Sequence, residues 1–139
     1  MQAIPTIHFQ GSCDDALRFY REALGAELLF RFQVGDVVDP QHIKPGTGHR
    51  ILRAGLRIGD SVIHLADGHA AEGPAFCGFS LTLAAVTEDE ARRMALALSA
   101  GGSIPMPLRP TAWAEVFGTV VDRFGLHWTI EAGRRFATA

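Results

Sequence analysis

The chain has 139 residues, of which 47% are hydrophobic and 20% charged, and its formal net charge is −2. This length predicts a single domain over residues 1–139, with a core large enough to fold unaided. The near-neutral charge and the absence of long basic runs argue against nucleic acid and anionic membranes as partners. No apolar stretch reaches bilayer length, and the N-terminal segment "MQAIPTIHFQG" lacks the basic and apolar regions of a signal peptide. We therefore expect a cytoplasmic protein with its two cysteines as free thiols.

The first predicted elements are a strand over residues 6–9 and a helix that begins at Ser12 and ends at Gly25. Ser12 with Asp15 three residues later approximates a capping box, and glycine is a typical helix stop. Apolar residues recur at spacings of three or four, which is typical of an amphipathic helix. These apolar residues are Cys13, Ala16, Leu17, Tyr20 and Leu24. We interpret Cys13 as a small buried residue of this helix.

Three strand-like runs follow, at residues 27–34, 50–58 and 61–67, with a Gly- and Pro-rich loop before the second run. The last run, "SVIHLAD", places His64 in the middle of an apolar strand. An imidazole in that position is compatible with a metal ligand, a proton carrier, a contact in a ligand pocket or a hydrogen-bonded core residue.

The second half of the chain repeats this order. A strand at 79–83 precedes a helix that begins at Thr87, with Glu90 three residues later, and ends at Gly101. Strand-like runs at 103–108, 114–121 and 126–132 complete the repeat. The chain therefore reads as two βαβββ modules, roughly residues 1–70 and 75–139, which predicts an α+β fold.

Alternation along the strands assigns side chains to two faces of each sheet. We expect the apolar set to lie beneath the helices: Ile7, Phe9, Leu28, Phe30, Phe32, Leu52, Ala54, Leu56, Ile58, Ile63, Leu65, Phe79, Leu81, Leu83, Leu126, Trp128 and Ile130. The opposite set is mostly polar: Thr6, His8, Arg31, Gln33, Arg53, Arg57, Val62, His64, Ala66, Ser80, Thr82, His127, Thr129 and Glu131. If curved mixed sheets surround this second face, it forms a concave cleft suited to a small molecule. The alternative is a sheet face open to solvent.

Several motifs resemble the vicinal oxygen chelate superfamily, which includes glyoxalase I, bleomycin-resistance proteins, fosfomycin-resistance enzymes and extradiol dioxygenases. The helix "ALRFYREALGAEL" and the hairpin "FGTVVDRFGLHWTIEA" carry this resemblance, together with the duplicated module. The run "GGSIPMPLRPTAWAEVFGTVVDRFGLHW" is similar to the PhnB-like branch, often labelled 3-demethylubiquinone-9 3-methyltransferase. The resemblance implies a concave site, usually in a homodimer. Methyltransferase activity is not expected, because the chain has no Gly-rich loop to seat a methyl-donor nucleotide.

Metal-using members of the superfamily carry His or Glu ligands on the first and last strand of each module. On that pattern His64 occupies the ligand position of the fourth strand. The first-strand position, near residues 4–6, and the fifth-strand position, near 78–80, hold no strong donor, and Thr129 stands where the last strand usually has Glu. His8 and Glu131 are displaced substitutes. A divalent metal at His64, His8 and Glu131 is therefore a weak candidate, and no cofactor is expected.

The resemblance and the strand pattern together favour a small-molecule-binding protein without a tightly bound metal. The candidate ligand-binding residues are His8, Arg53, His64, Ser80, Trp113, Thr129 and Glu131. Arg53 is a candidate partner for an anionic group, Trp113 is either a cleft wall or a packing anchor, and Asp122 is expected to shape a turn. The loop histidines His42, His49 and His69 are expected at the surface. Two alternatives remain open: a metal-dependent lyase, isomerase or transferase acting on vicinal oxygens, and a non-catalytic dimeric scaffold.

Overall fold

A computed structural model describes residues 1–68 and 75–134 of the chain. It divides into two compact units, Met1–Pro74 and Ala75–Ala139, called here the N-terminal and C-terminal units. Across the described residues, none of the helices has both the length and the apolar character needed to cross a bilayer.

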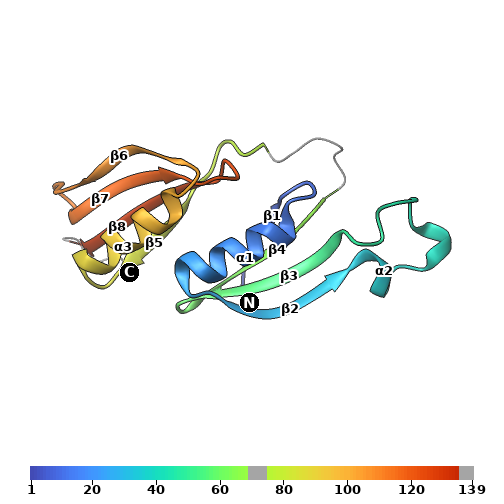
Figure 1. Cartoon of the computed structure of the whole chain (residues 1–139). Helices are drawn as coiled ribbons and strands as arrows, with labels where there is room; N and C mark the ends of the chain where they lie inside the picture. Colours follow the sequence, from blue (N-terminus) through green and yellow to red (C-terminus); the bar gives the residue numbers. More distant parts are fainter. Residues whose placement is uncertain (69–74, 135–139) are drawn as a thin grey trace. The chain divides into compact units, whose positions relative to one another are not determined.

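The N-terminal unit is a four-stranded mixed sheet with a helix on one face (Figure 1). Its elements are β1 (Thr6–His8), α1 (Cys13–Leu24), β2 (Glu27–Gln33), α2 (Val34–Val37), the 3-10 helix η1 (Pro40–His42), β3 (Ile51–Ile58) and β4 (Ser61–Ala66). The strand order is β1-β4-β3-β2, with β1 parallel to β4 and the other neighbours antiparallel. The short α2 and η1 lie in the segment that the sequence predicted as a loop.

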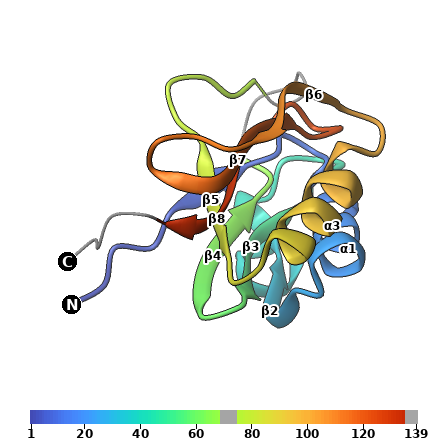
Figure 2. The same ribbon diagram turned by 90° about the vertical axis from the view of Figure 1, so that its left-hand side faces the viewer.

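The C-terminal unit repeats this arrangement. Its elements are β5 (Leu81–Ala85), α3 (Glu88–Ser99), β6 (Ser103–Arg109), β7 (Ala114–Val121) and β8 (His127–Arg134). The strand order is β5-β8-β7-β6, and in Figure 2 α3 lies to one side of its own strands. The α+β class with two βαβββ modules is confirmed. A cleft shared by the two sheets and a homodimer stay predictions.

The start of α1 is fixed by a buried carboxylate from the end of β4. Asp67, 4% exposed, accepts hydrogen bonds at Oδ1 from the backbone N–H groups of Gly11 and Cys13. Its Oδ2 accepts from the N–H of Ile51, the first residue of β3. The expected cap by Ser12 is wrong, because the Ser12 side chain makes no capping hydrogen bond. The carboxylate satisfies N–H groups that a helix start leaves without partners.

A β-bulge in β2 corrects the predicted placement of three side chains. The register pairs Leu28 with Leu56 but Phe30 with Gly55, so one extra residue lies between them. A bulge of this kind reverses the alternation of every later residue in the strand. Phe30 and Phe32, predicted beneath the helix, therefore lie on the opposite face. Arg31, predicted on that opposite face, instead lies on the helix side.

The new position of Arg31 is held by an ion pair with α1. Its Nε and Nη2 donate to the two carboxylate oxygens of Asp14 at 2.8 and 2.7 Å. These hydrogen bonds hold the pKa of the Asp14 carboxyl below its ordinary value. The fork-to-fork geometry is the strongest form of this pair.

Two further apolar residues are exposed where burial was expected. Leu52 is 39% exposed, because the register shifts again between Phe32 and Gln33 and leaves Leu52 out of the ladder. Phe79 is 46% exposed because β5 begins at Leu81, two residues later than predicted. The remaining predicted core positions of β8, Trp128 and Ile130, are fully buried.

The hairpin between β7 and β8 is built around a second buried carboxylate. Asp122 is 2% exposed, and its Oδ1 accepts from the N–H groups of Phe124 and Leu126. Its Oδ2 accepts from the indole Nε1 of Trp128 at 2.9 Å. The expectation that Asp122 shapes this turn is confirmed, and the same residue also anchors the largest core side chain.

Replacement of Asp122 by alanine should lower the free energy of unfolding by about 3 kcal/mol, because three donors, two of them in buried hydrogen bonds, lose their acceptor. Chemical denaturation monitored by tryptophan fluorescence measures this change. The matched control is Asp60→Ala, at the exposed tight turn between β3 and β4, which should change stability by less than about 0.5 kcal/mol. Equal effects of the two substitutions would contradict the anchoring role.

Candidate functional site

Polar and aromatic side chains share the sheet face of the N-terminal unit that α1 does not cover, called here the His64 face. Its members are Thr6, His8, Phe30, Phe32, Arg53, Gly55, His64 and Ala66. Cross-strand register places Thr6, His64, Gly55 and Phe30 in one row across all four strands. Residues opposite one another in neighbouring strands point to the same side, so this row is a continuous surface.

His64 is held by an aromatic ring and a guanidinium. The ring of Phe30 meets the imidazole edge to face, with centroids 5.2 Å apart. Nη1 of Arg53 lies 3.4 Å from Nδ1 of His64. Gly55 makes the ring contact possible, because a Cβ at this position would lie 2.5 Å from Cε1 of Phe30. The half-buried imidazole is thus neither in the core nor fully solvated.

A hollow of about 590 Å³ adjoins the His64 face where β3 begins. Its polar lining is His8, His42, Lys44, Thr47, Arg50 and Arg53. Its apolar lining includes Val34, Val38, Ile43, Ile51 and Leu52. Most of these residues come from the connection between β2 and β3, which carries α2 and extends beyond the strand ends in Figure 1. The volume is typical of a small-molecule site.

Two candidate residues, His8 and Arg53, line this hollow, and Arg53 also contacts His64. His42 was expected to be merely exposed, and it is exposed but lines the hollow too. His49 is exposed, and His69 lies outside the described residues. Lys44, Arg50 and Phe32 were not singled out from the sequence. Phe32 was missed because the bulge changes the face of the sheet on which its side chain lies. Lys44 was missed because an irregular loop has no periodicity from which to place a side chain.

The candidate residues of the C-terminal unit lie on more than one element. Thr129 pairs with Thr82 and with Thr119, which forms a row of three hydroxyl side chains across β5, β8 and β7. Glu131, 8% exposed, binds Nε of Arg134 through its Oε1 at 2.7 Å.

The other two candidates lie outside strands. Ser80 is exposed and precedes β5. Trp113 lies between β6 and β7, is 46% exposed, and meets Phe117 edge to face at 5.2 Å between centroids. As ligand contacts, all four C-terminal residues stay predictions.

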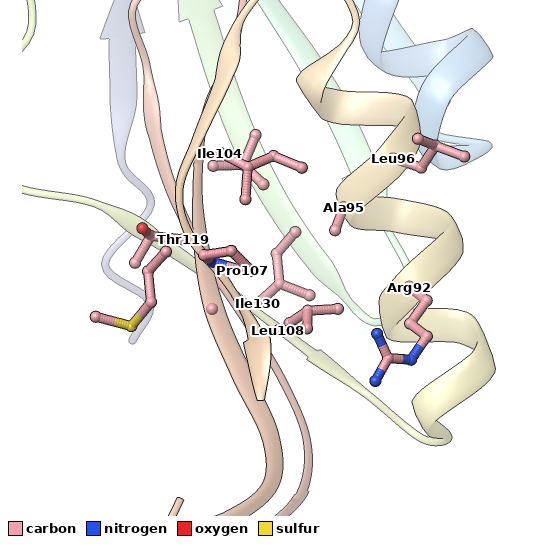
Figure 3. A pocket seen from close by; sticks show the side chains of 11 residues that line it. Arg92, Ala95, Leu96, Ile104, Pro107, Leu108, Thr119 and Ile130 are labelled. Carbon is pink, nitrogen blue, oxygen red and sulfur yellow. The ribbon is translucent and has the colours of Figure 1, made fainter. Parts of the chain in front are cut away.

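A second hollow, of about 370 Å³, lies in the C-terminal unit between α3 and β6 (Figure 3). Ala95 and Leu96 line it from the helix, and Ile104, Pro107 and Leu108 line it from the strand. Its charged member, Arg92, is ion-paired with Glu88 at 2.9 Å. An apolar hollow with so few orienting groups is a weaker ligand site than the one beside His64.

The residues of the N-terminal unit do not fit a metal centre. His8 pairs with Ala66, two residues beyond His64, so the two imidazoles are offset by about 7 Å along the strands. The guanidinium beside His64 would repel a cation. Nowhere in residues 1–68 and 75–134 do three His, Cys, Asp or Glu side chains gather in a way that could hold a metal ion. Convergence of His8 and His64 with Glu131 stays a prediction.

Comparisons with known proteins agree on one family. Residues 6–130 match the Glyoxalase/Bleomycin resistance protein/Dioxygenase superfamily. Protein YjdN of Escherichia coli is 32% identical over an alignment that covers 99% of each chain. Protein PA1353 of Pseudomonas aeruginosa superimposes with a TM-score of 0.84 at 34% identity, over 96% of this chain and 98% of that one. A Bacillus cereus structure titled as a putative 3-demethylubiquinone-9 3-methyltransferase, PhnB protein, has a TM-score of 0.78 at 20% identity, over 96% and 100% of the chains, which shows the fold alone.

Gly55→Ala should lower the free energy of unfolding by about 1–3 kcal/mol, because the new methyl group overlaps the Phe30 ring. In a Phe30→Ala background the same substitution should cost less than half as much, since the overlapping ring is gone. Gly48→Ala is the control, because a Cβ there would meet its nearest atom at 3.9 Å. A cost for Gly55→Ala that is independent of Phe30 would contradict this packing.

The two cysteines should differ sharply in reactivity. Cys13 is fully buried. Its burial, and to a smaller extent the nearby Asp67 carboxylate, raise the pKa of its thiol far above the ordinary value. Cys77 is exposed. An aromatic disulfide reagent at pH 8 should therefore label one thiol per native chain quickly, and none quickly in Cys77→Ser. Rapid labelling of Cys13 in the native protein would show that its thiol is accessible.

Proposed function

Because this chain belongs to the glyoxalase/bleomycin resistance protein/dioxygenase superfamily, we propose that it is a small-molecule-binding protein whose ligand lies on the His64 face. The ligand extends from the Phe30–His64 pair into the adjoining hollow. Binding needs no resident metal in this proposal.

One observation carries the proposal: the bulge in β2 turns Phe30 and Phe32 onto the same face as His64 and Arg53. Phe32 is 49% exposed, a large amount of apolar surface for a side chain in a strand. Its cross-strand partner is Arg53, which lines the hollow. Exposed aromatic surface beside a few polar groups is the usual composition of a ligand site, in which apolar burial supplies energy and polar groups fix orientation.

His64 has a defined task under this proposal. Arg53 is a cation with no acceptor, so its contact favours a lone pair on Nδ1 and a proton on Nε2. Nε2 then offers an N–H donor to the ligand. Phe30 holds the ring in this orientation from the side.

A metal-dependent enzyme is the second candidate, favoured by the imidazole at the position where the resemblance implies a ligand. Elemental analysis of protein purified without chelator separates the two functions. We expect less than about 0.1 divalent ion per chain, and no change in melting temperature on adding manganese, nickel or zinc. Stoichiometric metal that is absent from His64→Ala would favour the metal-dependent enzyme and contradict the metal-free binding protein.

Binding itself is tested with Phe32→Ala. Thermal shift against a panel of aromatic alcohols, amides, amines and acids should find stabilising ligands, and a ligand at 100 times its Kd adds about 2.7 kcal/mol. Phe32→Ala should weaken such a ligand about tenfold, because aromatic contact area is lost.

Phe79→Ala is the matched control, with an equally exposed phenylalanine in the other unit. It should leave the affinity unchanged. Equal losses in both variants would place the ligand elsewhere, and a panel without any stabiliser would favour the non-catalytic scaffold.

A further inference from the structure

The hollow beside His64 is strongly basic. Three cationic side chains, Lys44, Arg50 and Arg53, line it, and none of the described residues in its lining is an Asp or a Glu. They come from three places: the loop after η1, the residue before β3, and β3 itself. Positive charges that converge on one cavity from separate segments raise the local concentration of anions.

The carboxylates nearest in sequence are engaged with backbone groups. Both oxygens of Asp67 accept N–H groups on the helix side of the unit. Asp36 accepts from the N–H of Gln33, and Asp39 from the N–H of Gln41, so each caps its own turn. These acids hold the walls of the hollow and do not line it.

Arg53 and Lys44 differ in their ion pairing from five other basic residues of the chain. Arg18, Arg31, Arg57, Arg92 and Arg134 each have a carboxylate oxygen within 4 Å. In the part of the chain that the structure describes, no carboxylate lies within that distance of Arg53 or Lys44. Arg53 contacts the His64 ring through Nη1 and also lines the hollow, and a guanidinium has five N–H donors in all.

Arg50 is positioned rather than loose. Its Nη1 donates to the backbone oxygen of Gly68 at 3.2 Å, which holds the guanidinium at the wall formed by the end of β4. A guanidinium already held in place loses little entropy when it contacts an anion. The lining also has an apolar part, called here the apolar wall, with Val34, Val38 and Ile43.

We propose that this hollow binds an organic anion, a molecule with a carboxylate or a phosphoryl-type group on a compact apolar or aromatic body. The anionic group lies among Lys44, Arg50 and Arg53, and the body lies against Phe32 and the apolar wall. The proposal rests on ligand binding at the His64 face and adds the chemical class of the ligand.

The test uses four probes that share a benzyl group and differ in charge: benzyl alcohol, benzylammonium, phenylacetate and benzylphosphonate. Amide chemical-shift titrations of the full chain give the Kd of each probe at fixed pH. The two anions should bind at least tenfold more tightly than benzyl alcohol, and benzylammonium should bind most weakly. The affinity of the anions should fall between 50 and 500 mM salt, because screening weakens exposed charge pairs. The phenylacetate and benzylphosphonate arms distinguish a carboxylate ligand from a phosphoryl ligand.

Arg53→Gln and Lys44→Gln should each lower the ratio of anion affinity to benzyl alcohol affinity about 5- to 20-fold. Arg57→Gln is the matched control, since Arg57 lies on the same strand but is paired with Glu27 and does not line the hollow. Each variant is first checked for an unchanged melting temperature.

The outcomes separate the two proposals. Equal binding of benzyl alcohol and both anions, or anion binding that survives Arg53→Gln and Lys44→Gln, overturns the anionic class and leaves ligand binding in place. If none of the four probes shifts the amide resonances of the His64 face, ligand binding there is overturned as well.

Discussion

The Asp67 carboxylate is the constraint on which the N-terminal unit depends. It joins the N-terminus of α1 to the first residue of β3, through three backbone donors from two segments. A buried carboxylate is tolerated only when its oxygens are satisfied, and here the donors come from the chain itself. Because Ile51 is one of them, the same carboxylate fixes where β3 leaves the irregular connection. The position of Ile51, which lines the hollow beside His64, therefore depends on a carboxylate on the helix side of the sheet.

In the C-terminal unit Asp122 has a similar role, because it accepts hydrogen bonds both from the backbone of a turn and from a core tryptophan. Asp122 lies within the run "GGSIPMPLRPTAWAEVFGTVVDRFGLHW", the motif whose resemblance to the PhnB-like branch was noted in the sequence. In that motif Asp122 and Trp128 bond to one another, Trp113 packs on Phe117, and a Cβ on Gly118 would lie 2.7 Å from the backbone oxygen of Met106. The motif therefore identifies the family through its folding requirements, and it says little about chemistry.

Periodicity predicted most of the fold. The helices, the strand order along the chain, the buried stripe with Cys13 and Tyr20, and the duplication all follow from apolar spacing and stop glycines. The candidate site was harder to predict, because it depends on departures from periodicity. A bulge adds one residue without changing composition, so alternation alone placed Phe30 and Phe32 on the wrong face. His8, Arg53 and His64 were assigned correctly to one face because β1, β3 and β4 are regular there. Lys44 and Arg50 lie in irregular backbone, where no periodic pattern predicts the direction of a side chain.

The edge strand β6 has a consequence for the behaviour of the protein at high concentration. Pro105 and Pro107 occupy alternate positions of this strand, whose one neighbour among the described strands is β7. Neither residue has an amide hydrogen to offer an incoming strand, and both hold the backbone in a fixed φ. This edge of the sheet is therefore a poor template for fibrillar growth. The protection against self-association comes from the backbone of the strand and not from surface charge.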